Sequence, residues 1–133
     1  MSPPPAILLD TNALLWLVTT PEKISDSARD VLSEPTNEVM VSAASAWEIA
    51  IKTRLGRFHG DPLLSAWSHI IADMSATELP IDAGDAILAG RLPWEHKDPF
   101  DRVIVAQAAR RNLTIATSDT RILGTALTPT LKI

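Results

Sequence analysis

The chain has 133 residues, of which 46% are hydrophobic and 21% are charged, and its formal net charge is −4. This length predicts one domain, residues 1–133, that buries enough apolar surface to form a hydrophobic core. The balance of hydrophobic and charged residues excludes a chain that is disordered throughout, and the negative net charge argues against a uniformly basic protein that coats nucleic acid.

The first half of the chain contains two short apolar segments that we predict as buried strands, Ala6–Leu9 and Val39–Val41. Helices are predicted over residues 12–18, 25–33 and 42–55. Ser42 is expected to cap the last of these helices, and Gly56 lies just beyond its end.

The second half follows the same alternation. A helix is predicted to begin with Asp61 as its N-cap and Pro62 in its first turn, and to run to about Met74. Two more helices are predicted over 82–91 and 98–111, and short strands over 77–81, 113–117 and 130–133. Short apolar strands that alternate with helices predict an α/β fold, in which a parallel sheet of four or five strands is covered on both faces.

The chain carries no cysteine, which excludes disulfide bonds, thiolate zinc sites and cysteine nucleophiles. The opening residues, MSPPPAILLD, lack the basic region and the long apolar run of a signal peptide. The apolar run from Ala13 to Val18 is too short to cross a bilayer. We therefore expect a cytoplasmic protein that makes no membrane contact.

Two acidic residues follow predicted strands directly. Asp10 comes after the first strand, and Asp119 comes after the strand that ends at Thr117. Ligands of parallel sheets bind at the carboxyl ends of the strands, so both residues are candidates for a functional site. The structural alternatives are an N-cap for Asp10 and a turn for Asp119.

Two further acidic residues lie on predicted helices beside apolar side chains. Glu48 shares a helical stripe with Ala44, Ile51 and Leu55, and a buried carboxylate needs a partner or a metal; its alternative is a surface pair with Lys52. Asp101 shares a face with residues 104, 105 and 108, although Asp98 and Asp101 also suit the start of a helix.

These four carboxylates would repel one another if they met at one edge of the sheet. A divalent cation removes that repulsion, and a set of oxygen ligands without histidine or cysteine selects Mg²⁺ or Mn²⁺ over Zn²⁺. Such sites characteristically act on phosphate esters. Convergence of these residues would therefore indicate a metal-dependent phosphoesterase.

At these positions the sequence resembles the PIN-domain nucleases, and specifically the VapC-type toxins of bacterial toxin–antitoxin pairs. The segments that carry the resemblance are Leu8-Leu9-Asp10-Thr11-Asn12, Val41-Ser42 with Trp47-Glu48-Ile49-Ala50-Ile51-Lys52, His96-Lys97-Asp98-Pro99-Phe100-Asp101-Arg102, and Thr117-Ser118-Asp119. Their order and spacing cover nearly the whole chain.

The resemblance implies a three-layer α/β/α sandwich and a metal-dependent endoribonuclease. Asp10, Glu48, Asp101 and Asp119 match the acidic quartet that binds metal in this family, and Asp98 competes with Asp101 for the same place. Thr11, Asn12 and Ser118 resemble the groups that orient those carboxylates or the attacking water. The resemblance also implies an RNA substrate, a homodimer and a cognate antitoxin partner.

RNA binding by an acidic protein needs local cations. Lys52 and Arg102 are the candidates that lie beside the acidic motifs, and Arg54, Arg57, Lys97 and Arg121 are further ones. Arg110 and Arg111 are expected to be ordinary solvated charges. The four tryptophans are expected in the core, and the three histidines lack the spacing of a zinc site.

Other classes of function are less well supported. The sequence has no glycine-rich phosphate loop and no G-x-S-x-G nucleophile motif. A receiver domain also gathers acids at strand ends, but it needs a phosphorylatable Asp where this chain has Ser42. The alternative from a different class is a non-catalytic binding module whose acidic pocket receives a basic segment of a partner.

Overall fold

The computed structural model describes residues 6–125 and 127–133, and these contain one sheet of five parallel strands. The strands are β1 (Ala6–Leu9), β2 (Glu38–Ser42), β3 (Thr77–Leu79), β4 (Thr114–Thr117) and β5 (Thr130–Lys132), in the spatial order β3-β2-β1-β4-β5. The parallel sheet confirms the predicted α/β class and includes all five of the expected strands.

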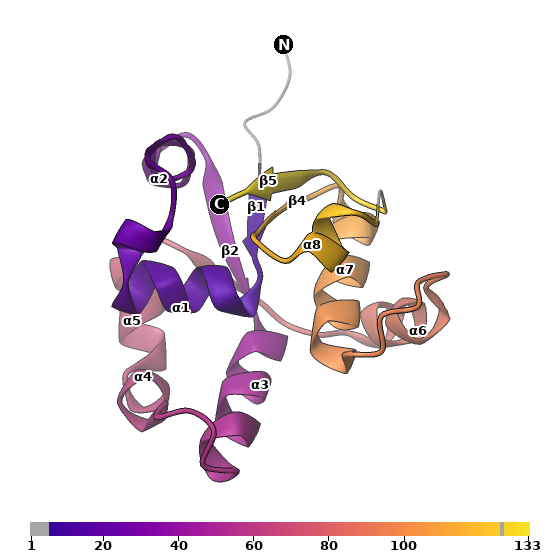
Figure 1. Ribbon diagram of the computed structural model, residues 1–133, viewed down its shortest axis with the longest axis horizontal. Coiled ribbons are helices and arrows are strands. Elements are labelled where there is room, and N and C mark those ends of the chain that lie inside the picture. The colour runs from indigo at the N-terminus through magenta and orange to yellow at the C-terminus, as the bar shows by residue number, and fades with distance from the viewer. Residues whose placement is uncertain (1–5, 126) are drawn as a thin grey trace.

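Helices cover both faces of this sheet (Figure 1). They are α1 (Thr11–Thr19), the 3₁₀ turn η1 (Pro21–Lys23), α2 (Asp26–Ser33), α3 (Ala43–Arg54), α4 (Asp61–Ser65), α5 (Trp67–Asp73), α6 (Ala83–Arg91), α7 (Pro99–Arg111) and α8 (Thr120–Leu123). In Figure 1, α1, α2, α4 and α5 lie to the left of the strands, and α6 and α7 lie to the right.

The alternation of side chains along β1 divides the core into two clusters. Ile7 and Leu9 pack with Leu14 and Ile71 on the face that α1 and α5 cover. Leu8 faces the other way and packs in the cluster that includes Ile104 of α7. This division into a helical layer, a sheet and a second helical layer confirms the expected three-layer sandwich.

The order of the strands places a topological switch beside β1. The chain moves outward from β1 through β2 to β3, and then returns so that β4 pairs with the opposite edge of β1. Leu9 therefore lies between Val41 and Ala116, near the carboxyl ends of all three strands. Open α/β sheets bind their ligands outside such a switch point, and Asp10 and Asp119 follow the two strands that flank it.

Several helices begin where the sequence predicts. Three side chains predicted to cap or begin helices accept a backbone N–H of the first turn: Asp10, Ser42 and Asp98. Asp82, the first residue of the helix predicted over 82–91, caps α6 in the same way. Gly56 follows the end of α3 with a φ of 74°, a conformation that glycine adopts without strain. These local signals fix how the chain enters the helices that carry the candidate acids.

The helix predicted over 61–74 is wrong in two respects. It is broken at Ala66, where φ is −106° and ψ is 16°, so that α4 and α5 are separate short helices. Gly60, and not Asp61, occupies the N-cap position, and no side chain caps it. A Cβ at residue 60 would lie 2.5 Å from Oγ1 of Thr53, so this close approach to α3 requires glycine.

The predicted strand over 77–81 ends early, at Leu79, because Pro80 has no N–H to donate to the ladder. The expectation of core tryptophans is wrong for Trp47, which is 51% exposed. Trp67 and Trp94 are partly buried and pack against the two core clusters, and Trp16 is partly buried. No helix in the described ranges is long and apolar enough to span a membrane.

Candidate metal centre

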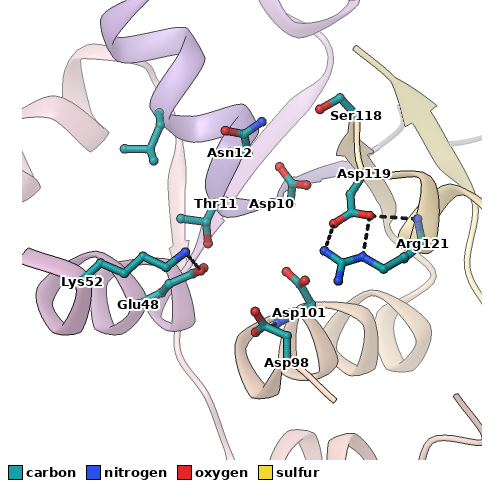
Figure 2. Close-up of a pocket in the computed structure, with 11 residues that line it drawn as sticks. Asp10, Thr11, Asn12, Glu48, Lys52, Asp98, Asp101, Ser118, Asp119 and Arg121 are labelled. Atoms are coloured by element: carbon teal, nitrogen blue, oxygen red, sulfur yellow. Dashed lines mark hydrogen bonds and ion pairs between the residues drawn. The ribbon is translucent and has the colours of Figure 1, made fainter. Parts of the chain in front are cut away.

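A cavity of about 350 Å³ opens at the carboxyl ends of β1 and β4 (Figure 2). The side chains around it come from α1, α3, α7 and the turn that leads into α8: Asp10, Thr11, Asn12, Leu15, Glu48, Lys52, Asp98, Asp101, Ser118, Asp119 and Arg121. We call this cavity the acidic pocket. The structure thus brings together all four acids that the sequence singled out, although 109 positions separate the first from the last.

Asp10 lies at the base of the acidic pocket and is 3% exposed. Its Oδ1 accepts the backbone N–H of Ala13 at 2.7 Å, and its Oδ2 accepts the hydroxyl of Thr117 at 2.5 Å. The pKa of Asp10 is raised to about 6, chiefly by burial and also by the negative charges of Asp101 and Asp119, while the two hydrogen bonds act in the opposite direction. The N-cap role and a place in the acidic pocket are therefore compatible.

Asp101 projects into the pocket from the first turn of α7 (Figure 2). Burial raises its pKa, and so do the charges of Asp98 and Glu48, while a hydrogen bond from His96 lowers it. Residues 104, 105 and 108 on the same face are completely buried, so the inward stripe predicted for this helix is correct.

His96 is a neighbour of Asp101 that the sequence did not single out. Its Nε2 lies 2.7 Å from Oδ2 of Asp101. Potential ligand atoms of His96, Asp98 and Asp101 all lie within 4.8 Å of one another. The signal that could have identified His96 is its place at the head of the segment His96–Arg102, which carries the resemblance and contains the cap of α7.

Asp98 lines the pocket while it caps α7. Its Oδ1 accepts the backbone N–H groups of Phe100 at 2.9 Å and Asp101 at 3.2 Å. The prediction that Asp98 lies at the start of this helix is therefore confirmed. The carboxylate has a second oxygen that these two bonds do not use.

Glu48 enters the pocket from α3 and is 5% exposed. Lys52 donates to its Oε2 at 2.5 Å, whereas Oε1 is buried without a hydrogen-bond partner among the described residues. The ion pair with Lys52, given above as the structural alternative for Glu48, is present. It involves only Oε2 of the carboxylate. The stripe predicted for Glu48 ends earlier than expected, because Leu55 is 49% exposed.

Asp119 sits on the opposite wall, at the N-cap of α8. Arg121 donates to both of its oxygens, from Nε at 3.2 Å and from an Nη at 2.9 Å (Figure 2). These hydrogen bonds lower the pKa of Asp119. Lys52 and Arg121 therefore place one cation on each side of the pocket, each paired with a carboxylate.

The three polar residues predicted to orient the acids also line the pocket. The hydroxyl of Thr11 lies 2.9 Å from that of Ser45 on α3, so it ties α1 to the helix that carries Glu48. Asn12 is exposed beside Asp10, and Ser118 stands next to Asp119.

Arg102, which the sequence predicts as a substrate-binding residue, does not line the acidic pocket. Its guanidinium points into the loop between α6 and α7 and donates to four backbone carbonyls, those of Ala89, Leu92, Trp94 and His96, at 2.7–3.0 Å. Carbonyls that no helix satisfies attract this cation more strongly than open solvent does. Arg102 thereby fixes the loop that carries His96.

Arg110 and Arg111 are not the ordinary solvated charges that we expected. Both donate to the carboxylate of Asp85, at 2.6 and 2.8 Å, and Asp85 is 0% exposed. Although burial opposes ionisation, the hydrogen bonds from the two arginines lower the pKa of Asp85 to about 2. No local sequence pattern indicates this pairing, because 25 residues separate Asp85 from Arg110.

The chemistry of the acidic pocket is that of a site for a hard cation. The charges of neighbouring carboxylates raise the pKa values of Asp10 and Asp101, and Glu48 has a buried oxygen without a partner among the described residues. Oxygen donors of this kind are the ligands that Mg²⁺ and Mn²⁺ prefer. The residues present therefore fit a divalent cation.

A family model described as PIN domain matches residues 7–126 of the chain. This match includes the four acids of the pocket. A comparison with curated proteins finds no match.

Solved structures with the same fold include chains of three crystal structures. VapBC2 from Rickettsia felis, bound to a DNA fragment from its promoter, gives a TM-score of 0.70 at 14% identity, with 95% of this chain and 97% of that chain covered. VapBC-1 from nontypeable Haemophilus influenzae gives 0.68 at 17% identity, with 96% and 97% covered. VapBC-5 from Mycobacterium tuberculosis, a member of the VapBC family of toxin–antitoxin systems, gives 0.61 at 21% identity, with 98% and 100% covered.

Proposed function

The chain belongs to the PIN-domain family, and on that basis we propose that it is a metal-dependent endoribonuclease and the toxin of a toxin–antitoxin pair. The observation that carries the proposal is the meeting of Asp10, Glu48, Asp101 and Asp119 around one cavity at the switch point of the sheet. A solved structure of similar fold belongs to a toxin–antitoxin system, which supports the assignment to such a pair.

Asp10, Glu48, Asp101 and Asp119 would hold the cation, with Asp101 rather than Asp98 as the ligand from α7. Asp98 already commits one oxygen to two backbone N–H groups, whereas Asp101 points into the cavity from an inward-facing stripe. When bound, Mg²⁺ or Mn²⁺ activates a water and neutralises charge on the phosphate.

The protein's own residues hold that arrangement in place. Ala13 and Thr117 fix both oxygens of Asp10 from two different elements. His96 fixes Asp101, and Thr11 joins α1 to α3 through Ser45. Asn12 and Ser118 line the entrance, where they can orient the attacking water. Side chains that are held in this way need little rearrangement when the substrate binds.

Lys52 and Arg121 are the cations that would bind the phosphates of RNA. Each already lies at the edge of the pocket, paired with a carboxylate. A phosphodiester that enters between them meets positive charge on both sides of a strongly acidic cavity. This placement supplies local attraction for RNA in spite of the net charge of −4.

The proposal includes a cognate antitoxin as protein partner, a homodimer as the assembly and the cytoplasm as the location. An antitoxin would silence the enzyme by covering the acidic pocket, and a basic segment would complement the charge there.

The test is RNA cleavage by the purified protein with Mg²⁺ or Mn²⁺, in parallel with a chelator. Asp10→Asn should abolish cleavage without unfolding the domain, and Asp30→Asn, the same change at an exposed position on α2, should leave it intact. Cleavage that persists in the chelator or in Asp10→Asn contradicts the mechanism. A folded protein that binds a basic peptide but cuts no RNA supports the non-catalytic module instead.

A further inference from the structure

A second cavity, of about 650 Å³, adjoins the acidic pocket. One wall is the loop before α7, with Pro93, Trp94, Glu95 and His96, and the other is α8 with the turn after it. We call this the side cavity. Its volume lies within the range of cavities that hold small organic ligands, and nothing in the proposed cation chemistry uses it.

The side cavity and the acidic pocket share a wall. Arg121 lines both of them. The imidazole of His96 stands at the boundary, with Nε2 at 2.7 Å from Asp101 and Nδ1 at 3.3 Å from an Nη of Arg121. The side cavity therefore begins one aromatic ring away from a carboxylate that would hold the cation.

The lining combines an apolar surface with hydrogen-bonding groups. Pro93 and Trp94 supply apolar lining, and the Trp94 and His96 rings meet edge to face with centroids 4.9 Å apart. Glu95 and Thr120 supply polar groups, and the carboxylate of Glu95 makes no hydrogen bond or ion pair with the described residues. A nucleobase has the matching character, since its faces are apolar and its edge is polar.

The side cavity is also well held before any ligand arrives. Arg102 donates to the backbone carbonyls of Leu92, Trp94 and His96, so the loop is fixed at three points along one wall. On the other wall, α8 is capped by Asp119. A site that is already formed binds with a smaller loss of conformational entropy.

We propose that the side cavity binds the base of the nucleotide next to the scissile phosphate, and that it selects a base with an exocyclic amino group. The inference rests on the proposed ribonuclease function. With a phosphate among the carboxylates, a strand that leaves the acidic pocket past Arg121, which lines both cavities, would bring its next base to the side cavity. An ionised carboxylate only accepts hydrogen bonds, and the exocyclic amino group of cytosine, adenine or guanine donates to it, whereas uracil offers only its ring N3–H. Glu95 therefore favours the three amino-bearing bases.

The first experiment sequences the 5′ ends of RNA cut by the wild type, Glu95→Gln and Trp94→Leu. The wild type should show an amino-bearing base at one fixed position beside the cut. Glu95→Gln should lose that preference several-fold while it still cuts RNA, because an amide can also donate. Glu95 is exposed, so this variant tests the proposal even if Trp94→Leu fails to fold.

The second experiment measures RNA binding without cleavage, in Asp10→Asn protein, by fluorescence anisotropy. An abasic nucleotide at the identified position should weaken binding about ten-fold or more. Adding Trp94→Leu should remove most of that difference, whereas Trp16→Leu, the same change on α1 and outside both cavities, should preserve it.

Two results overturn the proposal, and they are distinguishable. RNA cleavage whose base preference survives both Glu95→Gln and Trp94→Leu, or that shows no preference beside the cut, refutes the base site but leaves the ribonuclease intact. A protein that neither cuts nor binds RNA refutes the proposed function and this inference with it.

Discussion

Asp10→Asn should stabilise the metal-free protein at neutral pH, because it removes a buried negative charge. This gain should exceed what is lost when the hydrogen bonds from Ala13 and Thr117 no longer have a charged acceptor. The pKa of Asp10 rises from 3.8 to about 6 in the folded protein, chiefly through burial. At 1.36 kcal/mol for each pKa unit, ionised Asp10 costs the fold about 3 kcal/mol. Asparagine has the same shape and is an equally good N-cap, so it keeps the bond from Ala13 without the charge.

The sign of the pH dependence follows from the same pKa. Between pH 4 and pH 6 the folded protein binds more protons at Asp10 than the unfolded chain, so the stability contributed by this group is present below pH 4 and is lost as the pH rises through 6. The variant and the wild type should therefore have similar stability near pH 4. At pH 7.5 the variant should be more stable by about 3 kcal/mol.

The measurement is thermal unfolding in a chelator across this pH range. For a domain of this size the difference at pH 7.5 corresponds to a melting temperature about 10 °C higher in Asp10→Asn. Saturating Mg²⁺ should shrink or reverse the difference, because it stabilises the wild type by binding the folded state. Asp30→Asn serves as the matched control. A variant that melts below the wild type at pH 7.5 in the chelator would show that the bonds from Ala13 and Thr117 outweigh burial and repulsion.

Three further predictions concern residues around the pocket and its supports. Asp85→Asn should lower the free energy of unfolding by about 2–3 kcal/mol at pH 7 in urea titrations, because it removes the buried carboxylate that Arg110 and Arg111 share and leaves them only the more exposed Asp82. The exposed Asp73→Asn should change the free energy of unfolding little, and equal effects of the two variants would refute the pairing. In the wild type, the stability from Asp85 should persist above pH 4 and be lost as the pH falls through about 2. Arg102→Lys should raise the amide hydrogen-exchange rates of residues 92–98 at least ten-fold and leave those of β1 unchanged, since a lysine cannot reach four carbonyls at once. Arg91→Lys is the control. Unaltered exchange rates in Arg102→Lys would contradict the role given to Arg102. Lys52→Met in Asp10→Asn protein should weaken RNA binding and reduce its salt dependence by about one counterion, and an unchanged slope would remove Lys52 from the phosphate contacts.

The fold and the members of the acidic pocket could be predicted because their signals are local. Asp10, Ser42 and Asp98 indicate where helices begin. The short apolar segments that alternate with these helices predict a parallel sheet. The position of Asp10 and Asp119 after strands then places them at one edge, since parallel strands end together. Glu48 and Asp101 lie on helices, and only the family resemblance predicts that they reach the same edge of the sheet.

The errors concern residues whose partners lie far along the chain or on the backbone. Arg110 pairs with Asp85, which lies 25 residues away in the chain. Arg102 donates to backbone carbonyls, and no residue type marks such an acceptor in a sequence. Trp47 is a large apolar residue on a helix, yet it faces outward because small residues of α3, such as Ala44, face the sheet. The position of His96 depends on the loop whose carbonyls Arg102 binds. The sequence therefore could not predict where either side chain lies.

Residues 10, 48, 101 and 119 are proposed to hold one divalent cation. Crystals soaked in Mn²⁺ and measured for anomalous scattering test it directly. We expect a peak inside the acidic pocket, within about 2.3 Å of carboxylate oxygens that include those of Asp10 and Asp101. A peak at His96 and Asp98 alone, or a well-ordered pocket without any peak at saturating Mn²⁺, would contradict it.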